Sequence, residues 1–365
     1  MADRSAPFVP PHCPRSDCAY HTPTPGWRWV RYGSFARQAS PQRIPRFRCV
    51  HCRHTFSSQS FRVDYWLRRP DVLRALTFRL LTCSGYRQLA REPDCAPTTI
   101  MRQVARLGRQ ALLFLEAHRP AGPVGEPLVV DGFESFAHSQ YHPLHVNLVV
   151  GAESHYIYAF THTELRRKGR MTARQRRWRA RLEERHGRPD PRGIERGMEQ
   201  AIRLAAREPQ PLVVRSDEHP AYPRALRQLR GYAVRHERTS SRLARTTGNP
   251  LFPVNRADLQ LRHNCANHKR ETIAFSKRHQ GVVDRVAGLV LWLNFAKRFS
   301  ERRGGPTPAM RLGLAERPIP LPQVLQWRLF PAQVPLPEPW RSYFLGEVRT
   351  RRYPREVSYR ARLAP

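Results

Sequence analysis

Two apolar runs in this chain stop on an acid, and this pattern constrains the fold more than any other feature. Residues 128–131 read LVVD, and residues 212–217 read LVVRSD. Short apolar, β-branched runs predict buried strands, so each run should deliver a carboxylate to the edge of a sheet. The alternative is that Ser216 or Asp217 caps a helix over 222–226, since both residue types are favoured helix caps.

Further periodic segments around these two runs set the expected fold class. Strand patterns cover 126–136, 145–153 and 155–164, with a turn near Ser154, and further strands are expected at 212–218 and 231–237. Helical patterns cover 192–208 and about 255–298. The order β-β-β-α-β-α-β-α predicts an α/β fold, a mixed sheet with flanking helices, whose first three strands form a meander.

The charge of the chain points to a polyanionic partner. Lys and Arg number 64 against 29 Asp and Glu, which gives a formal net charge of +35. Such a chain repels itself unless a polyanion neutralises it, and phosphate backbones are the usual partner. A membrane surface competes for this role, but the first residues lack a signal segment and the apolar run 286–295 is too short to span a bilayer. We therefore expect a soluble intracellular protein that binds DNA and no membrane.

Four of the seven cysteines form two close pairs, Cys13 with Cys18 and Cys49 with Cys52. In a reducing compartment such pairs indicate a metal rather than disulfides. Thirty residues separate the pairs, enough for two hairpins to bring four thiolates around a structural Zn²⁺. Four ordinary thiols are the alternative, and a nearby histidine at 12, 51 or 54 is a substitute for one cysteine.

Residues 84–110 have the proportions of a helix-turn-helix. A short helix ends near Glu92, a turn follows at 93–95, and a second helix is expected to be capped by Thr98 or Thr99. In such a motif the second helix enters the major groove by its N-terminal residues. The residues expected to face DNA are Thr98, Thr99, Arg102, Gln103 and Arg106. A helical hairpin without a DNA-binding role is the alternative.

A third acid completes a possible metal site with Asp131 and Asp217. The segment 267–278 is expected to be helical and carries Glu271 among basic residues. Two strand-end aspartates and a helix glutamate can hold two Mg²⁺ or Mn²⁺ ions, the apparatus for displacement at phosphodiesters. Lys277 and Arg278 would grip the DNA backbone nearby, since Arg278 lies two helical turns after Glu271. Glu134, Glu218 and Asp258 are rival ligands, with Asp258 the most serious, and each acid has a structural alternative as a cap or a surface ion pair.

An arginine-dense segment, 165–192, interrupts the predicted sheet and is expected to form a surface excursion. Within it we expect five side chains to hold DNA backbone: Arg174, Arg176, Arg177, Arg179 and Arg181. Removal of such contacts weakens binding to all sequences alike. The alternative is a solvated basic loop.

These motifs together resemble an insertion-sequence transposase of the DDE type. The resemblance rests on CPRSDC with RFRCVHC, VVDGFE, VRSDEHPAYPRAL and NHKRETIAFSKR, and it covers most of the chain to about residue 300. It implies a zinc ribbon, a helix-turn-helix and an RNase H-like catalytic core. In that core Asp131, Asp217 and Glu271 would hold two divalent ions, and Arg278 would match the basic residue that follows the family's glutamate. The long arginine-rich segment, the Pro-rich tail and the wide gap before Glu271 depart from the family pattern.

The resemblance also implies a domain plan and an activity. We expect a zinc ribbon at 1–62, a helix-turn-helix domain at 63–120, a catalytic domain at 121–303 with the insertion at 165–192, and a Pro-rich basic tail at 304–365. Such an enzyme binds the terminal inverted repeats of its element, hydrolyses a phosphodiester and joins the freed 3′ hydroxyl to target DNA. We expect a homo-oligomer on DNA in a prokaryotic cytoplasm, associated with the nucleoid. The alternatives are a DNA-binding regulator or inactive domesticated remnant, and a metal-dependent nuclease without strand joining.

Overall fold

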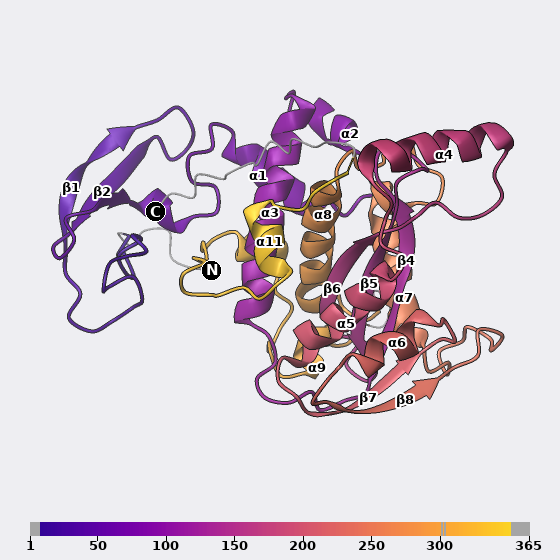
Figure 1. Ribbon diagram of the computed structural model, residues 1–365. Coiled ribbons are helices and arrows are strands. Elements are labelled where there is room, and N and C mark those ends of the chain that lie inside the picture. Colours follow the sequence, from indigo (N-terminus) through magenta and orange to yellow (C-terminus); the bar gives the residue numbers. More distant parts are fainter. Residues whose placement is uncertain (1–7, 301, 303, 352–365) are drawn as a thin grey trace.

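The structure of the chain is a computed structural model that describes residues 8–300, 302 and 304–351. Its first part, which we call the cysteine module (residues 8–61), contains a small antiparallel sheet. The strands are β1 (Trp29–Ala36), β2 (Arg43–Cys49) and β3 (Thr55–Ser57), followed by the 3-10 turn η1 (Ser58–Phe61). Figure 1 shows this module set apart from the larger sheet. The module buries an aromatic cluster around Phe47 and Phe56.

Three helices follow, as the sequence predicts: α1 (Pro70–Arg79), α2 (Tyr86–Arg91) and α3 (Pro97–Ala117). The expected apolar stripe on α3 is confirmed, because Ile100, Val104 and Leu107 are fully buried. The second half of α3 packs against α8 (His279–Leu291). The two helices approach closely at Gly108, where an added Cβ would lie 2.7 Å from the carbonyl oxygen of Asp284. The pair α3–α8 therefore connects the three helices with the larger sheet (Figure 1).

The larger sheet is mixed and has the order β6-β5-β4-β7-β8. Its strands are β4 (Leu128–Phe136), β5 (Pro143–Gly151), β6 (Ile157–Glu164), β7 (Pro211–Ser216) and β8 (Ala233–Arg238). β4, β5 and β6 pair antiparallel in sequence order, so the expected meander is confirmed. β7 pairs parallel with both β4 and β8. The chain therefore has the mixed α/β character that its sequence predicts.

Helices on this sheet bring further residues to it. α5 (Gly193–Ala206) packs on β5 and β6 and against α6 (Ala221–Arg227), while α7 (Phe252–Asn264) packs on β4 and β5. The π-helical turn η3 (Trp292–Ala296) ends α8. None of the helices in the described ranges is long and apolar enough to cross a membrane.

The arginine-dense segment forms an excursion, as expected, and its centre is the helix α4 (Ala173–His186). The Thr172 side chain caps this helix by accepting a hydrogen bond from the backbone N–H of Gln175, and the side-chain oxygen of Gln175 accepts one from the backbone N–H of Thr172. Not one residue of α4 is buried. Figure 1 shows α4 extending away from the sheet.

The C-terminal tail ties the parts of the chain together. It carries the short helices α9 (Pro308–Arg311), α10 (Leu321–Val324) and α11 (Trp340–Leu345). Phe330 is buried in the aromatic cluster of the cysteine module, and Trp340 lies in the core of the large sheet. Between them, the Gln110 side chain of α3 donates to the carbonyl of Trp327, and the backbone N–H of Arg328 donates to the carbonyl of Phe61. The part of the predicted tail at 352–365 lies outside the described residues.

The prediction of a helix over 267–278 is wrong. The structure has a 3-10 turn, η2 (Ala266–His268), and the next helix begins only at His279. Local hydrogen bonds replace the helical pattern: the Thr272 hydroxyl donates to the carbonyl of Ala266, and the Asn267 amide donates to the Ser276 hydroxyl. Side chains of this kind compete with helix formation by bonding nearby groups.

Candidate metal centres and nucleic-acid interface

The four paired cysteines lie together at one end of the cysteine module. The sulfur atoms of Cys13, Cys18, Cys49 and Cys52 all lie within 4.8 Å of one another. A zinc ion bound at about 2.3 Å to four tetrahedral thiolates needs sulfur separations of about 3.8 Å, and the sulfurs of Cys13 and Cys52 are 3.6 Å apart. The donor set fits a tetrahedral ion such as zinc without rearrangement of the backbone.

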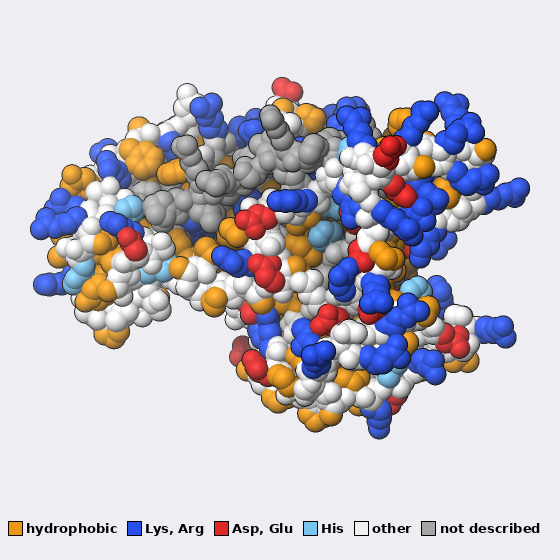
Figure 2. All heavy atoms as spheres, viewed as in Figure 1, with side chains coloured by type: hydrophobic (Ala, Val, Ile, Leu, Met, Phe, Trp, Pro, Cys, Tyr) orange, Lys and Arg blue, Asp and Glu red, His pale blue; other side chains and the backbone are white. Residues whose placement is uncertain are grey.

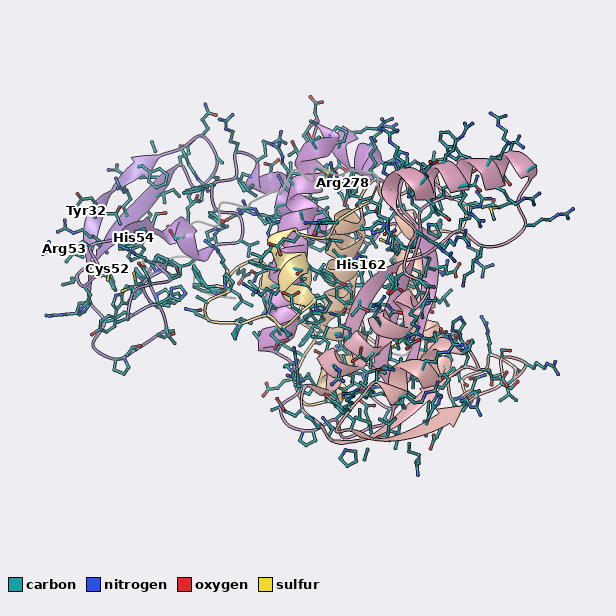
Figure 3. All side chains as sticks on the ribbon, viewed as in Figure 1. Tyr32, Cys52, Arg53, His54, His162 and Arg278 are labelled. Atoms are coloured by element: carbon teal, nitrogen blue, oxygen red, sulfur yellow. The ribbon has the colours of Figure 1, made fainter. Side chains whose placement is uncertain are left out.

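Turns from two hairpins build this cluster. In the first, the backbone N–H of Cys18 donates to the carbonyl of Arg15, and the N–H of Cys13 donates to the carbonyl of Tyr20. In the second, the N–H of Cys49 donates to the carbonyl of His54. Figure 3 shows Cys52 and His54 side by side in the same module. The longer gap of the first pair is accommodated by an ordinary turn.

The thiols of this cluster differ in acidity. Burial raises the pKa of Cys13 above its usual value, and the neighbouring thiols add to this effect. Burial acts in the same direction on Cys49, but backbone N–H groups and the Trp27 indole outweigh it and lower the pKa of Cys49 to about 7. The indole N–H of Trp27 donates to the sulfur of Cys49 at 3.3 Å. Hydrogen bonds of this kind favour the thiolate, the form that binds a metal.

Asp131 lies on β4, and Asp217 directly follows the neighbouring strand β7. Asp131 is the fourth residue of β4, which continues to Phe136, so Asp131 lies within the strand rather than at its end. In the parallel register of β4 and β7, Val129 pairs with Arg215, two residues before each aspartate. Neighbouring strands are about 4.8 Å apart, so the two carboxylates share one region of the sheet.

Asp217 is not the N-cap of α6. The N-cap position belongs to Pro220, whereas one oxygen of Asp217 accepts a hydrogen bond from the backbone N–H of His219 at 2.8 Å. This short turn fixes the direction of Asp217 just after β7. Ser216 is buried, and its hydroxyl is within 2.9 Å of the His236 ring from β8.

Asp258 from α7 joins this region. Asp131 and Phe133 share one face of β4. Phe133 contacts Arg262, in the last turn of α7, and His268, just beyond that helix. Burial, followed by repulsion from Asp131, raises the pKa of Asp258 well above its usual value. One carboxylate oxygen of Asp258 is buried and has no hydrogen-bond partner within the described ranges. A buried carboxylate oxygen without a donor is costly unless a cation compensates it.

Tyr222 from α6 links the acids. Its hydroxyl donates to a carboxylate oxygen of Asp131 at 2.8 Å. Burial and then the charge of Asp131 raise the pKa of Tyr222, and the charges of Asp217 and Asp258 act in the same direction. Burial and the charge of Asp217 likewise raise the pKa of Asp131, against the hydrogen bonds of Gly132 and Tyr222. Tyr222 is not among the site residues predicted from the sequence, although it follows Asp217 by only five residues.

Gly132 lets β5 approach the strand beside Asp131. A Cβ at this position would lie 2.1 Å from the carbonyl oxygen of Val146 and 2.6 Å from a carbon of the His145 ring. Distances below 3.0 Å to backbone require a shift of the chain. Any side chain at position 132 would therefore push β5 away from β4, directly beside Asp131.

Glu271 does not lie on the helix that the sequence predicts. It is exposed, in the irregular segment between η2 and α8. Arg278 is the N-cap of α8, so the expected common helical face of Glu271 and Arg278 does not form. Lys277, the residue before it, is exposed.

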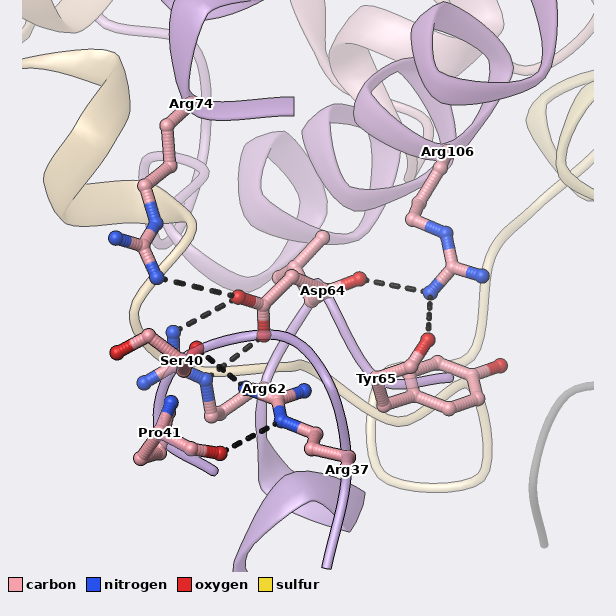
Figure 4. Close-up of polar contacts among 9 residues, drawn as sticks. Arg37, Ser40, Pro41, Arg62, Asp64, Tyr65, Arg74 and Arg106 are labelled. Carbon is pink, nitrogen blue, oxygen red and sulfur yellow. Dashed lines mark hydrogen bonds and ion pairs between the residues drawn. The ribbon is translucent and has the colours of Figure 1, made fainter. Parts of the chain in front are cut away.

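The expected DNA-facing residues of α3 divide into two groups. Thr98 and Arg102 are exposed and Thr99 is half-buried. Gln103 is buried and donates to the carbonyl of Arg69, and Arg106 donates to the carbonyls of Val63 and Tyr65. Figure 4 shows Arg106 directed at Tyr65, beside the ion pairs that Asp64 makes with Arg62 and Arg74.

The expectation that Gln103 and Arg106 face DNA is therefore wrong, because both side chains tie α3 to the segment before α1. The expected cap is also wrong: α3 begins at Pro97 after Ala96, and neither Thr98 nor Thr99 caps it. Pro at the first helical position lacks the N–H that a cap would bind and has the φ of a helix, which explains the earlier start.

The arginines of α4 form a basic surface with one exception. Arg174, Arg176, Arg177 and Arg181 are exposed. Arg179 is half-buried, donates to the carbonyl of Arg167 and forms an ion pair with Glu183 at 3.5 Å, so it anchors the helix instead. Figure 2 shows Lys and Arg side chains gathered over the helix that Figure 1 labels α4. This surface has the charge that a phosphate backbone requires.

Comparison with known proteins adds little to this geometry. No family model and no curated protein matches the chain. Among solved structures, one similar chain belongs to the cryo-EM structure of a simian T-cell lymphotropic virus intasome in complex with the PP2A regulatory subunit B56 gamma. The identity is 15%, the match covers 68% of this chain and 75% of that chain, and the TM-score is 0.25. A TM-score this low shows neither a shared fold nor a shared function.

Proposed function

We propose that the chain is a metal-dependent DNA transposase with an RNase H-like core, and that Asp131, Asp217 and Asp258 form its catalytic site. The geometry that carries this proposal is the hydrogen bond from Tyr222 to Asp131 together with a buried oxygen of Asp258, for which the described residues offer no donor. Neighbouring carboxylates repel one another, and bound cations relieve this repulsion. Hard divalent cations such as Mg²⁺ prefer such oxygen ligands.

Each side chain has a separate role in this proposal. Asp131 and Asp217 would hold ions from the sheet, and Asp258 would hold them from α7. Tyr222 keeps Asp131 in one orientation by donating to one of its oxygens, and leaves the other oxygen for a cation. When bound, the ions supply nucleophile activation and leaving-group stabilisation at a phosphodiester. Glu271, which the family resemblance names as the third acid, is the competing assignment.

DNA contacts are proposed on two surfaces. Thr98, Thr99 and Arg102 at the start of α3 would approach the element end, and Arg174, Arg176, Arg177 and Arg181 of α4 would hold phosphates. Lys277 and Arg278 lie just before α8 and are proposed to contact the backbone of the same DNA. The cysteine cluster would hold a structural Zn²⁺. Oligomerisation on DNA and activity at terminal inverted repeats remain part of this proposal.

Replacing the sheet aspartates tests the proposal. Asp131→Asn and Asp217→Asn keep the size and the hydrogen-bonding oxygen of the side chain but lose the charge that a divalent ion needs. Each variant should remain folded and bind the DNA that flanks its gene, yet lose both cleavage and strand joining by several orders of magnitude, because the ions stabilise nucleophile and leaving group together. The assay is cleavage of a labelled duplex with Mg²⁺ or Mn²⁺, then joining of a precut end.

The matched control is Glu218→Gln, which removes an exposed acid next to Asp217 and should retain activity. Full activity of Asp217→Asn would exclude the catalytic assignment and leave the turn at His219 as its role. Cleavage without joining by the wild-type protein would favour the nuclease alternative. Binding of the flanking DNA without any metal-dependent chemistry would favour a regulator.

A further inference from the structure

The edge strand β1 of the cysteine module exposes apolar side chains that lie outside the buried core of the module. In β1 every residue after Trp29 is exposed, including Val30 at 42%, Tyr32 at 44% and Phe35 at 40%. β1 is an edge strand of its sheet. The register with β2 shifts between Arg31 and Ser34, where Gly33 has a φ of 77°. Val30 and Tyr32 are two residues apart on the strand and therefore share one face of the sheet.

Two arginines of β2 meet this tyrosine. Arg46 and Arg48 alternate along β2 with the buried Phe47 and Cys49, so they point to the opposite side of the sheet from the aromatic core. Their guanidinium carbons lie 5.5 and 5.0 Å from the centroid of the Tyr32 ring. Val30 pairs with Arg48 across the two strands. We call Val30, Tyr32, Arg46 and Arg48 the outer face of the module.

The charge around the outer face is one-sided. Residues 8–61 contain eight arginines and one acid, Asp17, and no glutamate or lysine. Asp17 is already bound by Arg15. Within the described ranges no carboxylate lies within ion-pair distance of Arg46 or Arg48. Figure 3 places Tyr32 at the outer side of the module, away from the helices. The outer face therefore presents an aromatic ring and two unneutralised cations to solvent.

We propose that the outer face binds an unpaired DNA strand, with Tyr32 stacking on a base and Arg46 and Arg48 contacting flanking phosphates. Aromatic side chains interleaved with cations on a sheet are the arrangement that holds single strands without reading their sequence. A second copy of the same edge strand is a poorer occupant, because eight arginines on each copy repel one another. The proposal deepens the proposed function, since cleaving an element end exposes unpaired strands.

Equilibrium binding to single-stranded and double-stranded DNA tests this surface. The full chain, loaded with zinc and without added Mg²⁺, is titrated into a labelled thymidine homopolymer and into a duplex of the same length, followed by fluorescence anisotropy. Tyr32→Ala should weaken single-strand binding about fivefold or more, because a stacked base is lost, and should change duplex binding little. Arg46→Gln with Arg48→Gln should lower the salt slope for the single strand by about 1.4.

The matched control is Arg177→Gln with Arg181→Gln on α4, which removes the same charge at two other exposed arginines. This control should weaken both DNA forms and leave the single-strand response to Tyr32→Ala intact. Zinc content is measured for each variant, so that loss of the module is not mistaken for loss of the surface. Unchanged single-strand binding in Tyr32→Ala would overturn the proposal, as would a wild-type dimer that Tyr32→Ala converts to a monomer. Either result leaves the cleavage test of Asp131→Asn unaffected.

Discussion

The cysteine cluster and the proposed carboxylate cluster (Asp131, Asp217 and Asp258) are assembled differently. Each cysteine pair comes from a single turn, so only two segments must meet. The three acids come from β4, from the residue after β7 and from α7, which lie far apart in sequence. Local turns fix the first site almost completely, whereas the second depends on how a helix packs on a sheet. We therefore expect the metal at the cysteine site to be needed for folding. At the carboxylate site we expect the metal to be needed for catalysis and not for folding.

The largest expected effect is on the cysteine module. Cys49→Ser removes one of four thiolates, and structural zinc contributes about 10–16 kcal/mol of apparent binding free energy in small zinc-dependent modules. The variant should lose zinc, and the module should become sensitive to protease while the large sheet stays folded. Metal analysis and limited proteolysis measure both outcomes. If Cys49→Ser kept the zinc content and the protease resistance of the wild type, zinc would not be needed to fold the cysteine module. That result would contradict the difference drawn between the two sites.

A second expectation concerns a buried acid outside both clusters. Burial raises the pKa of Asp284 to about 6, although Gln280 donates to one of its oxygens and Arg109 lies nearby. Because the folded pKa lies above the unfolded value of 3.8, the folded state binds more protons, and stability falls as pH rises from about 4 to about 6. The loss is of order 3 kcal/mol, from about two units at 1.36 kcal/mol each.

Asp284→Asn should remove this loss, so the difference in unfolding free energy between variant and wild type should grow from pH 4 to pH 7. Denaturant unfolding at both pH values measures it. DNA cleavage should remain, because Asp284 accepts a hydrogen bond from Gln280 and belongs to α8, where its backbone packs against Gly108 of α3. Loss of metal-dependent cleavage in Asp284→Asn would contradict this expectation. Asp284 and Asp258 would then not differ in their importance for cleavage.

The smallest expected effect is at Tyr222, a positioning residue in the carboxylate cluster. Tyr222→Phe keeps the buried ring but removes the hydroxyl that donates to Asp131. A lost hydrogen bond to a charged group is worth about 1.5–3 kcal/mol, so cleavage should fall about tenfold or more. A merely structural role would lower stability without changing the metal concentration needed for half-maximal cleavage. We expect that concentration to rise, and an unchanged value would reduce Tyr222 to a packing residue.

The sequence predicted the parts of the molecule that depend on short-range patterns. Strand alternation predicted the meander of β4 to β6, and apolar spacing predicted the buried stripe of α3. The cysteine spacing predicted a cluster that the structure brings together. These patterns succeed because each is set by neighbours within one or two elements.

Long-range packing explains what the sequence did not predict. Side-chain hydrogen bonds of Thr272 and Asn267 replaced the helix expected around Glu271, and the position of Asp258 depends on α7 packing against β4. Gln103 and Arg106 carry polar groups typical of a DNA-binding face, yet they bond to carbonyls of a distant segment. The tail had no periodic signal at all, although Phe330 and Trp340 are buried in separate clusters.

Binding of Mn²⁺ to the zinc-loaded protein tests the carboxylate site most directly. Free Mn²⁺ is measured by electron paramagnetic resonance during titration of the wild type, Asp258→Asn and Glu271→Gln, without DNA. Asp258 has a buried oxygen to which no described residue donates, whereas Glu271 is exposed. We therefore predict that Asp258→Asn loses tight Mn²⁺ binding and that Glu271→Gln retains it. Retention in Asp258→Asn with loss in Glu271→Gln would contradict the site proposed here.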